Sequence, residues 1–150
     1  MRISDAARPL ALLLAAMTLL SACAGGAPRA SADPAVAPAM VIERFLRAAN
    51  ENDLDTMARL FGTTEGAVST KWPKKEQDER MFIFASVLRH SDYSIGQEQI
   101  VPGRRHEAAL FMVSMDISQN RVQVPFTVVR AKEHWLIENI DITRVTRGSR

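Results

Sequence analysis

His134-Trp135-Leu136-Ile137-Glu138-Asn139-Ile140-Asp141-Ile142 is the most informative stretch of the chain, because its apolar residues alternate with polar ones and then change parity. Side chains along a strand point alternately to the two faces, so Trp135 and Ile137 would share one face and the two later isoleucines the other. One extra residue at Glu138-Asn139, a β-bulge, brings all four onto one face. The stretch therefore predicts a bulged strand that covers a core.

The residues before this strand repeat its period of two. They predict three further strands over residues 93–101, 106–117 and 121–130, with turns at 102–103, 118–120 and 131–133. Pro102-Gly103 suits the centre of a type II turn. Pro125 lies within the third of these strands and demands an edge or a bulge, because proline donates no hydrogen bond. We expect a four-stranded antiparallel meander.

The segment from residue 38 to residue 61 has a helical period instead. Apolar stripes over 41–49 and 54–61 predict two helices, the first beginning near Pro38 or Ala39 and the second capped by Asn52. Gly62 is expected to end the second helix as its C′ residue.

Residues 62–73 are expected to form a loop, followed by a third helix over 74–89. The second half of that helix, 81–88, is apolar nearly all round, so we expect it to be covered on more than one side. The basic tail from Thr143 onward is expected to fray.

This order of elements, three helices and then an antiparallel meander, resembles the NTF2-like fold, also called cystatin-like α+β. The resemblance is carried by the helix pair 41–61 and the strand 134–142, and it covers roughly residues 39–145. It implies an α+β domain with three N-terminal helices packed on a curved four-stranded antiparallel sheet that forms a cone. Ketosteroid isomerases and small dehydratases of this family use the cone as an enzyme pocket, whereas many lipoprotein members have no assigned activity. No catalytic motif of those enzymes is matched here residue by residue.

The amino-terminal residues indicate export. Arg2 and Arg8 precede the uncharged run 10–20, which has the length of a signal-peptide core and is too short to cross a bilayer. Leu20-Ser21-Ala22-Cys23 resembles the lipobox of bacterial lipoproteins. That resemblance implies cleavage before Cys23, a diacylglycerol on its sulfur, and acylation of the new amino terminus by a chain such as palmitate. The alternative is an ordinary signal with a chance cysteine.

These patterns divide the chain into four parts: a signal peptide (1–22), the lipidated cysteine with a disordered Ala/Pro/Gly tether (23–38), an NTF2-like domain (39–145) and a flexible tail (146–150). As a coil the tether spans roughly 20 Å, and stiffening by proline extends it towards about 45 Å. Residue 24 is Ala rather than Asp, which by resemblance to lipoprotein sorting in enteric bacteria favours the outer membrane over the inner one. The domain is expected to face the periplasm.

Composition excludes several classes of function. Cys23 is the only cysteine, so its lipidation leaves no disulfide, and the domain must be held by core packing. The net charge of +2 falls to about +1 once Arg2, Asp5 and Arg8 leave with the signal, which is not the footprint of a nucleic-acid binder. No GxSxG, P-loop or Rossmann pattern occurs, and no cofactor is expected.

Histidines and strand carboxylates are the candidates for chemistry. His90, His106 and His134 lie at the ends of predicted elements, and a zinc site would need three or four convergent ligands, so no metal is expected. Three carboxylates on the predicted strands would serve in acid–base catalysis if the cone buried them and raised their pKa. These are Asp116, Glu138 and Asp141. The alternative is that they are solvated near strand ends.

Two basic clusters are candidate contacts for anions. Lys71, Trp72, Lys74 and Lys75 surround an aromatic ring with lysines, which suits anionic lipid headgroups. The alternative is a solvated loop balanced by the acids of the third helix. Arg104-Arg105 would bind an anionic ligand or, alternatively, form a plain exposed hairpin.

Four apolar residues fall on the other face of the predicted sheet: Leu110, Met112, Val129 and Leu136. An apolar outer face on a domain of this kind indicates a partner, and we expect a homodimer through it. The alternative is that the chain's own third helix or tail covers this face.

Three functions follow from these observations. The first is a lipid-anchored cell-envelope protein whose non-catalytic module binds a small apolar or amphipathic ligand, or a protein partner. The second is a small isomerase or dehydratase that uses a carboxylate in the cone. The third is an accessory subunit of an envelope assembly.

Overall fold

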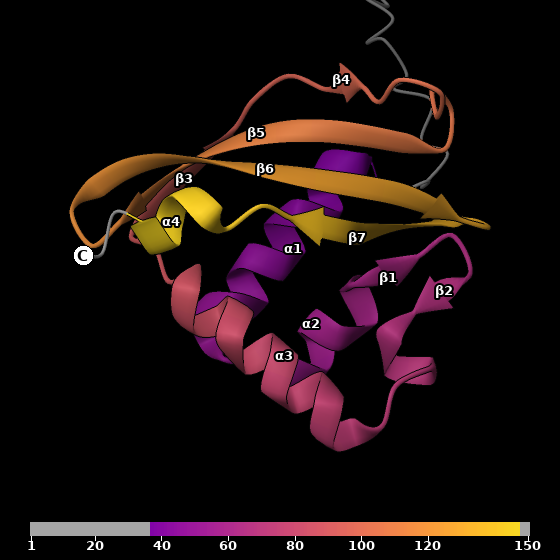
Figure 1. Cartoon of the computed structure of the whole chain (residues 1–150), viewed down its shortest axis with the longest axis horizontal. Coiled ribbons are helices and arrows are strands. Elements are labelled where there is room, and N and C mark those ends of the chain that lie inside the picture. The colour runs from indigo at the N-terminus through magenta and orange to yellow at the C-terminus, as the bar shows by residue number, and fades with distance from the viewer. Residues whose placement is uncertain (1–36, 148–150) are drawn as a thin grey trace, which may run out of the picture. The chain divides into compact units, whose positions relative to one another are not determined.

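Residues 37–147 are described by the computed structural model, so the predicted signal peptide, Cys23 and nearly all of the tether lie outside the described part. The chain order, shown in Figure 1, is α1 (Pro38–Glu51), α2 (Leu54–Leu60), β1 (Gly62–Thr63), β2 (Gly66–Ala67), a 3₁₀ turn (Val68–Thr70), α3 (Lys74–Val87), β3 (Asp92–Ile95), β4 (Gln99–Ile100), β5 (Ala108–Ile117), β6 (Asn120–Ala131), β7 (His134–Ile140) and α4 (Thr143–Arg147). The domain is therefore α+β. No helix in the described part is long and apolar enough to span a membrane.

The main sheet is antiparallel and has the strand order β3-β5-β6-β7, with β4 paired to the same edge of β5 as β3. The prediction of four strands was wrong in this detail, because the expected strand 93–101 is interrupted. Ile95 pairs with Val113 and Gln99 with Leu110, so this edge holds one more residue than β5 over the same interval. The interruption begins at Gly96, whose amide donates to the Met112 carbonyl.

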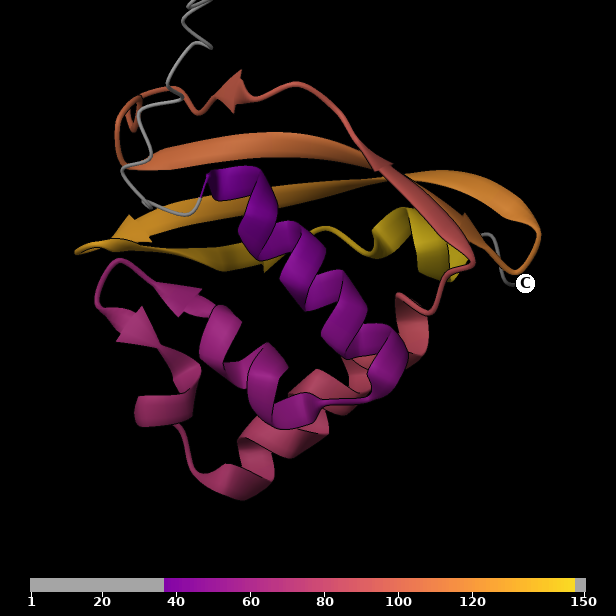
Figure 2. The ribbon, with the colours of Figure 1, turned by 180° about the vertical axis from the view of Figure 1, so that it is seen from behind.

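Helices α1, α2 and α3 gather on one side of this sheet, as the two opposite views in Figures 1 and 2 show. The apolar stripe of α1 is buried as the sequence predicts, and alternate residues of β5, Phe111, Val113 and Met115, face it. Phe45 of α1 contacts the rings of Phe61 and Phe84 at centroid distances of 6.3 Å and 6.4 Å. The space between sheet and helices is thus filled by apolar side chains.

The predicted bulge in the last strand is confirmed. Asn139 pairs with Thr127 and Ile137 pairs with Val128, which leaves Glu138 as the extra residue. Ile137 and Ile140 are consequently both buried in the helix-facing core.

Pro125 is accommodated at a local edge, also as expected. Its carbonyl accepts from the amide of Asp141, one residue beyond the end of β7. Because the N–H and C=O of one strand residue point to the same side, the missing donor of Pro125 faces the point where β7 has already ended.

The predicted caps of α2 were wrong at both ends. Asn52 has a left-handed backbone (φ 55°) and closes α1, while Asp53 is the N-cap and its carboxylate accepts from the Thr56 amide at 3.0 Å. Gly62 does not end α2 in a left-handed conformation but begins strand β1. Phe61, the residue after α2, is extended.

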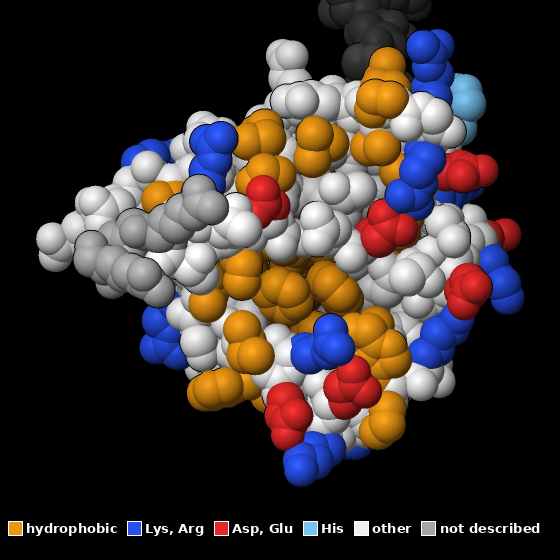
Figure 3. All heavy atoms as spheres, in the orientation of Figure 1, with side chains coloured by type: hydrophobic (Ala, Val, Ile, Leu, Met, Phe, Trp, Pro, Cys, Tyr) orange, Lys and Arg blue, Asp and Glu red, His pale blue; other side chains and the backbone are white. Residues whose placement is uncertain are grey.

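Two expectations about exposure were also wrong. Phe82 and Ile83 of α3 are 58% and 54% exposed, so the second half of that helix is covered on one side only. The basic tail does not fray over Thr143–Arg147, because α4 buries Val145 in the core. Figure 3 shows apolar side chains gathered on the face where α4 and the end of β7 lie above α3.

The outer face of the sheet is divided. Val129 and Leu136 are buried in a small second cluster packed against Val101 and Ala67. The chain therefore covers these two residues itself, but with other segments than the third helix or the tail that the alternative named. Leu110 and Met112 remain half-buried.

Candidate functional site

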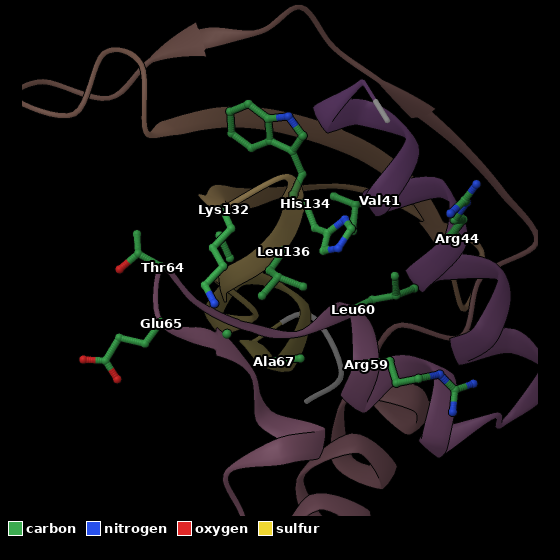
Figure 4. Close-up of a pocket in the computed structure, with 13 residues that line it drawn as sticks. Val41, Arg44, Arg59, Leu60, Thr64, Glu65, Ala67, Lys132, His134 and Leu136 are labelled. Atoms are coloured by element: carbon green, nitrogen blue, oxygen red, sulfur yellow. The ribbon is translucent and has the colours of Figure 1, made fainter. Parts of the chain in front are cut away.

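A pocket opens at the end of the sheet where the β6–β7 turn approaches the helices. Its wall is built from α1, the last residues of α2, the β1–β2 hairpin, and the first residues of β7. Figure 4 shows that side chains from these separate segments converge around one hollow. The cavity measures about 320 Å³, at the lower end of the range for small-molecule sites.

Most of the lining is apolar, with Val41, Leu60, Ala67, Trp135 and Leu136 among the wall residues. An engineered apolar cavity of about 150 Å³ holds one benzene molecule. The present pocket is about twice that size, which suits one aliphatic chain and not a pair of long chains.

Backbone geometry around two glycines fixes the hairpin that forms one wall. A Cβ on Gly62 would lie 2.3 Å from the Gly66 carbonyl oxygen, so only glycine permits this approach. Gly66 itself has a φ of 131°, a conformation that other residues rarely adopt. The Val68 amide donates to the Phe61 carbonyl at 2.8 Å, and Phe61 forms a parallel bridge with Ile137 of β7. These contacts hold the hairpin against the edge of the sheet.

The sequence predicted a loop over 62–73 and so missed this hairpin. The available signal was the spacing of the two glycines around Thr63-Thr64-Glu65, which leaves strands of only two residues each. Such short strands carry no readable alternation.

The β6–β7 turn forms the opposite wall. Ala131 pairs with His134, which leaves Lys132 and Glu133 as a two-residue connection. Lys132 has a φ of 57°, in the left-handed region where glycine and asparagine are preferred.

Four basic side chains, Arg44, Arg59, Lys132 and His134, line the pocket with one carboxylate, Glu65. In Figure 4, Lys132 and His134 extend from the strand side into the hollow, Arg44 and Arg59 stand on the helix side, and Glu65 points away. The pocket therefore has apolar walls, and basic side chains stand around them.

The one carboxylate of the lining is already compensated. Lys71 donates to Glu65 at 2.6 Å, and this hydrogen bond lowers the pKa of the Glu65 carboxyl. Arg59 donates to the Thr56 hydroxyl at 2.6 Å. Within residues 37–147, the side chains of Arg44, Lys132 and His134 make no hydrogen bond or ion pair. The pocket therefore carries an excess of positive charge.

The three carboxylates singled out from the sequence lie elsewhere. Asp116 accepts from Arg121 at 2.8 Å on the outer face of the sheet, and this bond raises the pKa of the guanidinium. Glu138 accepts two hydrogen bonds from Arg104, at 2.7 Å and 3.1 Å, which raise the pKa of Arg104. Asp141 accepts from the amide and the hydroxyl of Thr143. None of the three lines the pocket.

The basic cluster around Trp72 is neutralised by the chain itself. Lys71 pairs with Glu65, Lys74 pairs with Asp55 and with Asp78, and Lys75 lies 3.9 Å from Glu79. The Arg80 guanidinium stacks over the Trp72 ring at 4.7 Å. The excess positive charge lies at the pocket and not at this cluster.

The three histidines have different surroundings. His90 is bound to Asn50, whose side chain donates to the His90 carbonyl and accepts from its amide, and its ring meets Tyr93 edge-on. His106 is exposed, and His134 lines the pocket. Over the described residues, no group of three or more His, Cys, Asp or Glu side chains is placed to hold a metal ion.

Sequence reasoning missed the basic residues of the pocket. Arg44 is an exposed residue of α1, outside the apolar stripe that the sequence analysis used, and Lys132 fell in a predicted turn. Only the fold brings these residues, which are far apart in sequence, around one opening.

Comparison with known proteins adds little. No protein-family profile matches the chain, and no curated protein matches it. Among solved structures, the chain is similar to a phospholipid-binding protein from Ralstonia solanacearum that was determined in complex with a phospholipid. The two share 9% identity with a TM-score of 0.37, over 70% of this chain and 75% of the other. At this level of similarity the alignment assigns neither a fold family nor a ligand to this chain.

Proposed function

We propose that this chain is a lipid-anchored cell-envelope protein whose folded domain is a non-catalytic module that binds a small amphipathic or apolar molecule. The observation that carries the binding role is the pocket of about 320 Å³ with apolar walls. Apolar pockets with a few convergent polar groups are the usual form of small-molecule sites.

The proposed family is NTF2-like, with a cone formed by the sheet and the helices. Support comes from helices that precede an antiparallel sheet and cover one of its faces. In this proposal the interior of the cone is packed, and the ligand enters at its end beside the β6–β7 turn.

The anchoring part of the proposal comes from the amino-terminal sequence, which lies outside the described residues. Its support is the apolar run that ends in Leu20-Ser21-Ala22-Cys23. Several acyl chains, at about 0.8 kcal/mol per buried CH₂, would hold the domain at a membrane, with the outer membrane favoured.

The isomerase or dehydratase alternative gains no support from the placement of its residues. Such an enzyme needs a buried carboxylate or histidine beside its substrate. Among the described residues, Gln77 is the single buried polar side chain, and it donates to the Trp72 carbonyl.

A partner on the outer sheet face, either a second copy or a subunit of an envelope assembly, is proposed as a secondary role. Its support is the half-buried pair Leu110 and Met112, which the chain does not cover fully. Sedimentation of the wild-type domain and of Met112→Asp would test it. A dimer that Met112→Asp dissociates is expected, and a monomer in both would count against it.

Binding in the pocket can be tested with tryptophan fluorescence. Trp135 lines the pocket, and Trp72→Phe makes it the sole tryptophan of the chain. We expect saturable changes in its emission when an amphiphile such as dodecanoate is added to the unlipidated mature chain, residues 23–150 with Cys23→Ala. Native mass spectrometry of the same protein should show the added mass.

A pocket-filling variant supplies the control. Ala67→Leu adds volume to the wall and should weaken binding severalfold, whereas Ser86→Leu adds the same kind of side chain on the exposed face of α3 and should not. Equal binding by both variants, or no response of Trp135 to any amphiphile, would refute the proposal.

A further inference from the structure

We propose that the ligand of this pocket is a single-chain amphiphile with an anionic head group, and that Lys132 binds that head group. This inference rests on the proposed function and names the chemical class of its ligand.

Charge at the pocket is the first observation. Lys132 and Arg44 line it without a side-chain partner in the described part of the chain, and Glu65 is compensated by Lys71. Arg59 is a weaker candidate, because its charge also acts on Asp53 and helps to lower the pKa of that carboxyl. The lining thus carries uncompensated positive charge beside an apolar wall, which suits a ligand with an anionic group.

The position of Lys132 is the second observation. Its side chain reaches into the hollow from the β6–β7 turn, whereas Arg44 stands across the hollow on α1. Leu60, Ala67 and Leu136 lie on the wall of the same cavity. A head group held by Lys132 would therefore leave its chain in contact with apolar side chains.

The backbone of Lys132 is the third observation. A φ of 57° is easy for glycine and unfavourable for a lysine, so the turn alone does not favour this residue. Strained backbone positions concentrate at binding sites. A ligand for the lysine side chain would account for a lysine at this position.

The volume decides how many chains the ligand carries. A cavity of about 320 Å³ accommodates one aliphatic chain, or part of one, and excludes the simultaneous burial of two long chains. Fatty carboxylates and monoacyl phosphates share this chemistry.

The test compares two ligands of equal chain length, dodecanoate and 1-dodecanol, by the fluorescence of Trp135 in the unlipidated mature chain with Trp72→Phe. We expect dodecanoate to bind at least about fivefold more tightly than the alcohol at low salt, with the difference shrinking as salt rises. Lys132→Gln should weaken dodecanoate binding about three- to tenfold and dodecanol binding less than about twofold. Arg89→Gln removes the same charge from an exposed residue outside the pocket and should change neither.

Lys132→Gly separates loss of charge from loss of fold. Glycine suits a φ of 57°, so this variant should keep or raise the Tm while it weakens dodecanoate binding as much as Lys132→Gln does. A variant that weakened binding only by unfolding the turn would lower the Tm instead.

The outcomes are distinguishable. Equal affinity for dodecanoate and dodecanol, in the wild type and in Lys132→Gln, would overturn the head-group inference and leave the apolar pocket standing. Absence of binding by either ligand would overturn the proposed function as well. If inorganic phosphate bound the site as strongly as dodecanoate does, the site would bind an anion without needing an attached chain. That result would also overturn the inference.

Discussion

Glu138 shows how one residue determines the path of a strand. It is the extra residue of the bulge in β7, and its carboxylate accepts two hydrogen bonds from Arg104, in the turn that follows β4. The two side chains are only 33% and 26% exposed, so this pair is less screened than the other ion pairs of the described domain.

Arg104→Ala should therefore destabilise the domain by about 1–2 kcal/mol, because it leaves the half-buried Glu138 carboxylate without its donors. Urea unfolding measures this change. Lys75→Ala, which breaks a 3.9 Å contact on the exposed surface of α3, is the matched control and should have an effect near zero. An equal effect of the two variants would show that the Arg104–Glu138 pair adds nothing.

Asp53, the N-cap of α2, makes part of the domain's stability depend on pH. Hydrogen bonds from the hydroxyl and the amide of Thr56 lower the pKa of its carboxyl in the folded state. A lowered pKa means that the folded state binds the proton less readily than the unfolded one, so this contribution to stability is present above the unfolded pKa and is lost as pH falls through the folded one. Asp53→Asn keeps a good N-cap but cannot titrate. Its Tm should match that of the wild type more closely at pH 3 than at pH 7, and a Tm difference independent of pH would contradict this.

At the scale of elements, the β1–β2 hairpin is the segment on which the pocket depends. It is only two residue pairs long, and it is held by the Val68–Phe61 hydrogen bond and by the bridge from Phe61 to β7. The α4 helix plays a similar part at the far end of β7, where it places Val145 in the core. Short elements of this kind owe their conformation to what they pack against and not to their own propensity.

Gly62→Ala should displace the hairpin, because the new Cβ would lie 2.3 Å from the Gly66 carbonyl oxygen. We expect a loss of about 1–3 kcal/mol in the free energy of unfolding and weaker ligand binding at the pocket. Thr64→Ala, at the exposed tip of the same hairpin, should leave stability nearly unchanged. Full stability and binding in Gly62→Ala would show that the hairpin moves at little cost.

At the scale of the whole molecule, the proposed anchor and the proposed pocket belong to different parts of the chain. The described residues that line the pocket all fall between Val41 and Leu136, whereas Cys23 lies outside the described part of the chain.

Cys23→Ala should move the exported protein from the membrane fraction to the soluble fraction, because the proposed anchor is the acyl groups on Cys23 and no helix of the described domain is long and apolar enough to span a membrane. Fractionation of cells followed by immunoblotting measures this. Ala24→Ser, next to the lipobox, should leave membrane retention intact. Retention of Cys23→Ala in the membrane would mean that another part of the chain, or a partner, holds the protein there.

The sequence determined most of the sheet and the first helix because these elements are long and periodic. The stripe over 41–49 gave α1, the alternation in β5 and β6 gave the buried face, and the change of parity between Ile137 and Ile140 was enough to locate the bulge at Glu138. Each of these signals repeats over several residues, so it survives whatever the chain later packs against.

The pocket, by contrast, was decided by tertiary structure. Gly62 was expected to end a helix, but it instead permits the close approach of its backbone to that of Gly66. The basic tail forms a helix over Thr143–Arg147, and its Val145 is buried in the core. Arg44 and Lys132, 88 residues apart by their numbers, line opposite sides of one pocket only because the β6–β7 turn comes to lie near α1. Periodicity reports which face of an element is buried, but it does not report which elements meet, and the character of this pocket depends on that meeting.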